Sequence, residues 1–140
     1  MDKQRKQSGH IDCYRKTDVL TANRETILLM MYAGAIRFLK QAIEAFEKGA
    51  LSDWMKAVGR TQEIVNELRS SLNFEQGQEI ARNLEALYEF ITQRLITASM
   101  EKKVEPLKEA VRILETLNSA WEEAVAILKR EKQSQNKSSP

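Results

Sequence analysis

The stretch that decides the fold spans residues 72–88 and reads Leu72-Asn73-Phe74-Glu75-Gln76-Gly77-Gln78-Glu79-Ile80-Ala81-Arg82-Asn83-Leu84-Glu85-Ala86-Leu87-Tyr88. One apolar repeat ends at Leu72, and a new repeat begins with Ala81, Leu84 and Tyr88, spaced by three and four residues. That spacing places side chains on one face of an α-helix. The polar residues between the repeats include Gly77, and glycine accommodates a tight turn without a Cβ clash. The stretch therefore predicts a corner between two amphipathic helices.

The same three-and-four repeat recurs along the chain and predicts four helices, at residues 23–48, 52–72, 77–100 and 106–130, with no strand. Short connections make consecutive helices antiparallel. The predicted fold is therefore all-α, an antiparallel up-down four-helix bundle.

Residues that favour helix ends flank these repeats. We expect Asn23 and Ser52 to act as N-caps, Gly49 to stop the first helix and Pro106 to begin the last. The bundle domain is expected to span 21–130. A flexible leader over 1–20 and a disordered tail over 131–140 are expected on either side, since neither shows a helical repeat.

Composition indicates where such a protein works. The 140 residues suffice for one domain with a sizeable core, and 42% hydrophobic with 30% charged residues is typical of a soluble helical protein. We find no run near the roughly 18 apolar residues of a membrane span, and the charged start leads into no secretory signal. The single cysteine, Cys13, cannot form an internal disulfide and fits a reducing compartment. We therefore expect a cytosolic protein with no membrane insertion.

The net charge of +2 is unevenly distributed along the chain. Both ends are basic, while the body between them is mildly acidic. A nucleic-acid surface instead concentrates Lys and Arg on one face. The charge pattern disfavours nucleic acid as a partner, and solvated termini are the simpler interpretation.

Residues for catalysis or metal binding are scarce. A metal site in a bundle needs histidines on the helices, but the only histidine, His10, lies in the leader. His10 and Cys13 together are too few ligands for a metal site and make a poor nucleophile pair in a mobile segment. No glycine-rich loop is present to hold a phosphate. The sequence therefore predicts no enzyme activity, no metal and no cofactor.

The first and third predicted helices carry apolar residues on more than a third of their circumference. Ile27 and Met31 flank the stripe of the first helix, and Ile80 flanks that of the third. A helix that is apolar beyond its covered face leaves a groove, and an amphipathic peptide is the usual occupant of such a groove. A compact bundle can also absorb broad stripes, so periodicity alone leaves both interpretations open.

Three blocks of the sequence resemble the FliS-type flagellar secretion chaperones. They are Tyr14 with residues 19–23 (VLTAN) and 28–39 (LLMMYAGAIRFL), the corner at 72–88, and Ala120-Trp121. The corner is the most specific block, and the resemblance covers residues 14–125. The chain departs from the family pattern at four places: Asn23-Arg24 stands where Ser-Pro is usual, Ala33 replaces an aspartate, Gln78 a glycine and Phe90 a tyrosine.

The resemblance implies a cytosolic chaperone of a flagellated bacterium. Such a protein binds the C-terminal disordered segment of flagellin, prevents premature polymerisation and presents flagellin to the export gate. The residues that we expect to contact this partner are Tyr14, Ile27, Met31, Ile80 and Tyr88. Two alternatives stay open: a generic helical adaptor that binds an amphipathic helix of another partner, and a nucleic-acid-associated protein that uses its basic ends.

The leader carries a further hypothesis. Ile11, Tyr14, Val19 and Leu20 are apolar in an otherwise polar stretch. An empty apolar groove costs about 25 cal/mol per Å² in water, so a tethered segment anchored by Tyr14 is expected to cap the groove until flagellin displaces it. Alternatively, Tyr14 lies on a disordered arm or packs permanently on the bundle.

Overall fold

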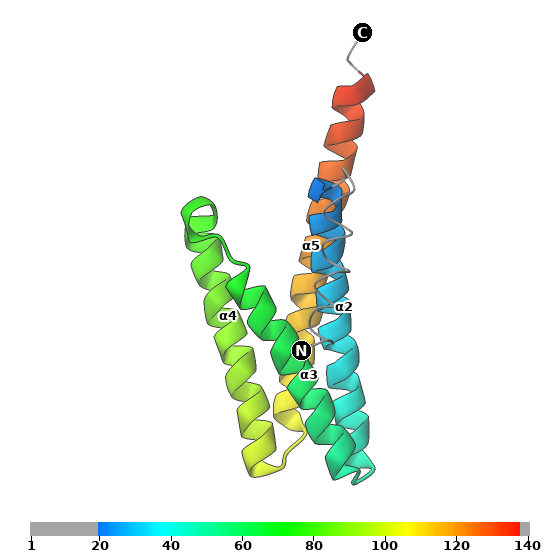
Figure 1. Ribbon diagram of the computed structural model, residues 1–140, viewed down its shortest axis with the longest axis vertical. Helices are drawn as coiled ribbons and strands as arrows, with labels where there is room; N and C mark the ends of the chain where they lie inside the picture. The colour runs from blue at the N-terminus through cyan, green and yellow to red at the C-terminus, as the bar shows by residue number, and fades with distance from the viewer. Residues whose placement is uncertain (1–19, 138–140) are drawn as a thin grey trace, which may run out of the picture.

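The computed structural model describes the backbone of residues 20–137 and the side chains of residues 24–135. This part of the chain is all helix and turn, with no strand between residues 20 and 137. The helices, labelled as in Figure 1, are α2 (Leu20–Glu47), α3 (Leu51–Ser70), α4 (Phe74–Glu101) and α5 (Glu105–Lys137). Each packs against the next in the chain, and α5 packs back on α2. The predicted up-down four-helix bundle is confirmed.

The core is formed by the apolar stripes read from the sequence. Its largest fully buried side chains are Tyr32, Leu39, Leu68, Tyr88, Ile91, Leu95, Leu107 and Leu114. Burial of apolar surface at about 25 cal/mol per Å² is the main favourable contribution to folding, so these positions hold the four helices together.

The bundle is closed at one end and splayed at the other. Figure 1 shows the α3–α4 corner leaning away from the α2–α5 pair, so that the molecule has the outline of a V. At the closed end, the rings of Phe46 and Trp54 meet edge to face with their centroids 5.2 Å apart. Ala42, Ala98 and Ala110 are also buried in the core, and small side chains let helices approach closely.

The helix ends correct three predictions about capping. The first helix begins at Leu20, so Asn23 lies within it and is not its N-cap. The second begins at Leu51 after Ala50, and no side chain caps it, so Ser52 is not a cap either. Pro106 follows Glu105 and is the second helical residue, where its missing N–H still leaves no helical bond unmade. Gly49 does end α2, with a φ of 72° that favours glycine.

The C-terminal boundary differs from the prediction. The sequence places the end of the bundle at 130 and a disordered tail over 131–140, but α5 continues to Lys137. Lys, Glu and Gln are good helix formers, so a helix already nucleated in the bundle propagates into this polar stretch. The side chains from Lys129 to Gln135 are polar and exposed, so no apolar repeat marks this part of the helix.

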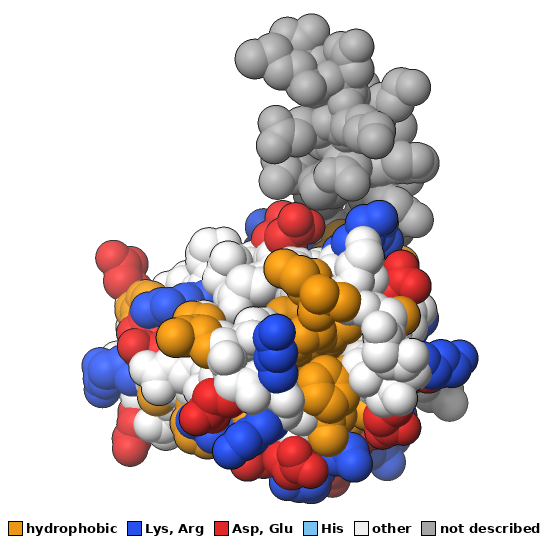
Figure 2. Space-filling model, turned by 90° about the horizontal axis from the view of Figure 1, so that it is seen from below, with side chains coloured by type: hydrophobic (Ala, Val, Ile, Leu, Met, Phe, Trp, Pro, Cys, Tyr) orange, Lys and Arg blue, Asp and Glu red, His pale blue; other side chains and the backbone are white. Residues whose placement is uncertain are grey.

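The end of the molecule that carries the two short loops is shown in Figure 2. Its hydrophobic side chains form a band among Lys, Arg, Asp and Glu side chains, and neither sign of charge dominates this face. Four surface ion pairs are present among the described residues, including Lys40–Glu115 at 3.3 Å between α2 and α5. Exposed pairs of this kind contribute roughly 0–1 kcal/mol each, so packing rather than charge defines the fold.

Candidate functional site

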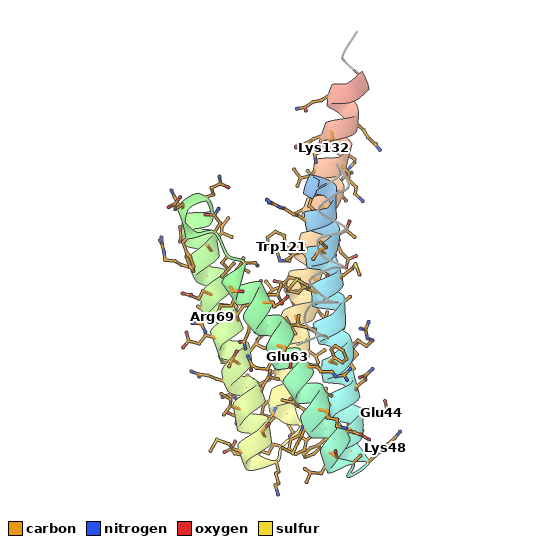
Figure 3. The ribbon with its side chains drawn as sticks, in the orientation of Figure 1. Glu44, Lys48, Glu63, Arg69, Trp121 and Lys132 are labelled. Carbon is orange, nitrogen blue, oxygen red and sulfur yellow. The ribbon has the colours of Figure 1, made fainter. Side chains whose placement is uncertain are left out.

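A cleft of about 260 Å³ lies in the opening of the V, between the α3–α4 corner and the α2–α5 pair. Its lining is mostly apolar and comes from all four helices: Leu28, Leu68, Ser71, Leu72, Asn73, Gly77, Ile80, Ala81, Leu84, Tyr88 and Trp121. Figure 3 shows Trp121 projecting from α5 into this opening. Because helix faces at this end are not covered by a neighbour, the cleft offers apolar surface to a partner.

The rim of the cleft is positioned by the corner between α3 and α4. The Asn73 side-chain Oδ1 accepts hydrogen bonds from the backbone N–H groups of Glu75 and Gln76, both at 3.1 Å, and so caps α4. After one helical turn, Gln78 breaks the helical geometry with φ 45° and ψ −114°. The sequence predicts a helix start near 77; instead α4 begins at Phe74 and bends at Gln78.

Gly77 is required at this corner by close packing. A Cβ built on Gly77 would lie 2.9 Å from the Cβ of Ala81, closer than side-chain carbons approach. The next residues then turn Ile80 outward at the rim, where 68% of its surface is exposed. The tight corner therefore places an exposed isoleucine beside the apolar lining of the cleft.

Three polar groups meet beneath the cleft and connect three helices. The indole Nε1–H of Trp121 on α5 donates to the hydroxyl oxygen of Tyr32 on α2 at 3.2 Å. The hydroxyls of Tyr32 and Tyr88 on α4 hydrogen-bond each other. Burial raises the pKa of both tyrosines above the ordinary value of 10, so both are neutral at physiological pH. A buried polar network of this kind fixes the relative positions of the helices that carry it.

The structure brings together two of the five residues that the sequence predicts for partner contact. Ile80 and Tyr88 both line the cleft, Ile80 at the rim and Tyr88 at the floor. Ile27 and Met31 are half-buried on α2, Met31 packs against the core, and neither lines the cleft. Tyr14 and the rest of the predicted leader up to residue 19 lie outside the described residues.

Most residues that line the cleft were not among the partner-contact residues predicted from the sequence. Leu28, Leu72 and Trp121 belong to the apolar stripes and are therefore indistinguishable from core residues by period alone. Their exposure to the cleft depends on the splay of the V, which moves the ends of regular stripes out of the core. Trp121 belongs to the Ala120-Trp121 pair, one of the three blocks that carry the family resemblance.

No group of three or more His, Cys, Asp or Glu side chains within residues 24–135 is arranged to hold a metal ion. A second hollow of about 530 Å³ lies between α2 and α5, but its lining is more polar than that of the cleft and includes the charged side chains of Arg37, Lys40, Glu44 and Glu115. Apolar partner surface therefore fits the cleft rather than this hollow.

Helix α2 contains the most apolar long segment among the described residues. The segment Arg24–Glu47 of α2 has a hydropathy of 1.3 and is long and apolar enough, by length and composition alone, to cross a membrane. In the bundle its residues Tyr32, Ala35, Leu39 and Ala42 are fully buried. α2 packs against α3 and α5, and these buried residues supply its share of the core.

Comparisons with known proteins agree with the family resemblance and the fold. The family described as flagellar protein FliS matches residues 7–128. The chain is 30% identical over 119 residues to the flagellar secretion chaperone FliS of Vibrio cholerae, covering 82% of this chain and 88% of that protein. It is 26% identical over 112 residues to the flagellar secretion chaperone FliS of Bacillus subtilis, covering 80% and 83% of the two chains.

A solved structure shares the architecture. The crystal structure of a flagellar chaperone from bacteria superposes with a TM-score of 0.71 at 20% identity, over 86% of this chain and 98% of that one. At this identity the match supports the four-helix fold alone, while the family match carries the assignment. The chain belongs to the FliS family of flagellar secretion chaperones, which are not enzymes.

Proposed function

We propose that this protein is a cytosolic export chaperone that binds the C-terminal disordered segment of flagellin in the cleft of the V. Binding covers apolar helical surface that flagellin monomers would otherwise use to polymerise, and it keeps the subunit available for the flagellar export gate. The observation that carries the proposal is an apolar cleft left open at the end of a FliS-family bundle. An amphipathic segment placed in an apolar groove is a recurrent mode of peptide recognition.

The dimensions of the cleft support a peptide ligand. At about 260 Å³ it is smaller than the roughly 300–1,000 Å³ typical of pockets that enclose whole small molecules. A cleft of this size accommodates a few apolar side chains of a longer segment, whose remainder lies along the surrounding helices. The exposed Ile80 at the rim extends the contact beyond the cleft itself.

The test is calorimetric binding of full-length chaperone to flagellin with and without its C-terminal segment. We expect binding with a negative heat-capacity change, which marks apolar burial, and loss of binding when the segment is deleted. The paired variants Ile80→Asp and Met100→Asp separate the cleft from general surface hydrophobicity. Both residues are exposed, at 68% and 79%, but Met100 lies at the far end of α4 and does not line the cleft.

We expect Ile80→Asp to weaken binding by about tenfold or more, because a charge placed against apolar surface must be desolvated. Met100→Asp should bind as the wild type does. Full affinity for flagellin without its C-terminal segment, or equal losses in the two variants, would refute the proposal.

A further inference from the structure

The last turns of α5 project past the rest of the bundle at the open end of the V (Figure 1). They carry three exposed basic side chains, which we name the cationic cluster: Lys129, Arg130 and Lys132. The single acidic residue among them is Glu131. The cationic cluster therefore gives a positive charge to the helix that also supplies Trp121 to the cleft.

The cationic cluster has no carboxylate partner in the described part of the chain. Side chains face each other along a helix at spacings of three and four residues, and no Asp or Glu lies at either spacing from any of the three cations. Glu131 is one or two positions from each of them, where side chains do not meet. The ion pairs among the described residues involve none of the three. Their charge is thus available to a partner.

Stabilisation of the helix end does not explain the cluster. Basic residues stabilise the C-terminal end of a helix through its dipole, but this effect is confined to the last turn. Helix α5 ends at Lys137, so its last turn follows the cluster. The cluster itself adds a repulsion, because Lys129 and Lys132 are three residues apart on one side of the helix.

The face of α5 that lines the cleft leads to the cluster. Leu128 and Lys132 follow Trp121 by seven and eleven residues, so each lies within about 20° of Trp121 around a helix of 3.6 residues per turn. Leu128 is 41% exposed. At a rise of 1.5 Å per residue, Lys132 lies about 16 Å beyond Trp121 along the axis, and Figure 3 shows both residues on α5 with Lys132 toward its free end. The cleft face therefore continues through an exposed leucine to an unpaired lysine.

We propose that the cationic cluster attracts an acidic stretch of the flagellin segment, next to the part that binds in the cleft. The inference rests on the proposed function, because the cleft must hold that segment. A distance of about 16 Å corresponds to about 5 residues of extended chain or about 11 residues of helix. The Asp and Glu residues that the cluster attracts therefore lie about 5 to 11 residues from the residue that contacts Trp121.

The cluster acts on the rate of association. Its side chains are exposed, and an exposed ion pair contributes only about 0–1 kcal/mol to a complex. Uncompensated charge at the rim of a binding site, by contrast, steers an oppositely charged partner during diffusional encounter. Removal of the cluster should therefore slow association, while dissociation depends on the apolar contacts of the cleft.

The test is a cluster variant that combines Lys129→Gln, Arg130→Gln and Lys132→Gln in the full-length chaperone. Glutamine is a good helix former, so α5 is retained, and circular dichroism checks this. Stopped-flow mixing with full-length flagellin measures association and dissociation. At low salt, we expect association to be slower than in the wild type by about 5- to 10-fold, with dissociation changed by less than about twofold. The difference should shrink at about 0.3 M salt, because salt screens exposed charges.

The matched control combines Lys102→Gln, Lys103→Gln and Lys108→Gln at the closed end of the bundle. These lysines are exposed and form no ion pair with a described residue, so the control changes the net charge by the same amount as the cluster variant. The control should associate as fast as the wild type. Equal slowing of the two variants would overturn the inference, because net charge rather than the cluster would set the rate. Unchanged association of the cluster variant would overturn it as well.

Two further outcomes separate the partners. Vesicles of phosphatidylglycerol are the probe for an anionic membrane surface. If they bind the wild type and not the cluster variant, while association with flagellin is the same for both, the cluster is a lipid site and the inference is wrong. The proposed function would survive that result. Failure of the wild type to bind flagellin at all would instead overturn the proposed function.

Discussion

The two ends of the bundle use the same helical repeats to different effect. At the closed end, Phe46 packs edge to face on Trp54, and the stripes carry small residues such as Ala98 that let helices approach. At the open end, the stripes carry Leu72 and Trp121, and the α3–α4 corner leans away from the α2–α5 pair (Figure 1). Apolar side chains are thus buried between helices at one end, where they stabilise the bundle, and line an open cleft at the other.

The two tryptophans show this difference at the level of single groups. Trp54 is buried at the closed end, and its indole nitrogen has no hydrogen-bond partner among the described residues. Trp121 is half-buried at the cleft, and its indole N–H anchors the hydroxyl network. Packing alone holds the first ring in place, whereas the second is also hydrogen-bonded to the buried tyrosine pair.

The two ends should differ most in how much the free energy of unfolding falls when a side chain is truncated to alanine. Leu107→Ala removes a fully buried side chain at the closed end and should lower the free energy of unfolding by about 2–5 kcal/mol. Ile80→Ala, at the exposed rim of the cleft, should change it by less than about 0.5 kcal/mol. Urea melts followed by circular dichroism measure both. Similar losses at the two positions would show that the open end is packed as the closed end is.

The second prediction concerns pH. The folded-state pKa values of Tyr32 and Tyr88 are raised above the unfolded value near 10, so the native chain keeps two protons that the unfolded chain loses. Stability is then fully present below about pH 10 and falls above it, by about 1.4 kcal/mol per pH unit for each tyrosine. Denaturant melts at a series of pH values between about 9 and 11, which bracket the ordinary tyrosine pKa, should show this decline in the free energy of unfolding.

Tyr88→Phe is the matched control for that decline. The variant keeps one of the two titrating groups, so its stability should fall with roughly half the wild-type slope. An equal slope in the two proteins would mean that the network does not hold the Tyr88 proton, and other groups would then account for alkaline unfolding.

The smallest effect is expected at the bend of α4, which lies between the cleft residues Gly77 and Ile80. Gln78 has a positive φ that a residue with a Cβ adopts at a cost of roughly 1–3 kcal/mol. Gln78→Gly relieves this strain but adds freedom to the unfolded chain, so we expect a net gain of about 1 kcal/mol. Gln78→Ala keeps the Cβ and should give no such gain. A stability of Gln78→Gly at or below that of Gln78→Ala would show that the bend is unstrained.

Local sequence determined the helices and their corner. Residues such as Leu39 and Leu95 recur every three or four positions, and this period places them on a buried face whatever the neighbouring helix is. Asn73 and Gly77 act within a few residues of themselves, through a cap and a close contact with Ala81, so the corner could be predicted from composition and spacing. The continuation of α5 to Lys137 escaped prediction because a solvated helix needs no apolar repeat.

Only the tertiary structure decided which apolar residues face the cleft. Ile27, Leu28 and Met31 lie within one turn of α2 and share the same chemistry, yet Leu28 alone lines the cleft, because the tilt of α4 uncovers that face of the helix. The hydroxyl network likewise joins Tyr32 to Tyr88 and Trp121, which are 56 and 89 residues away along the chain. Hydrophobic periodicity specifies that a side chain is apolar and on which face it lies, but the angle between helices determines whether that face meets the core or a partner.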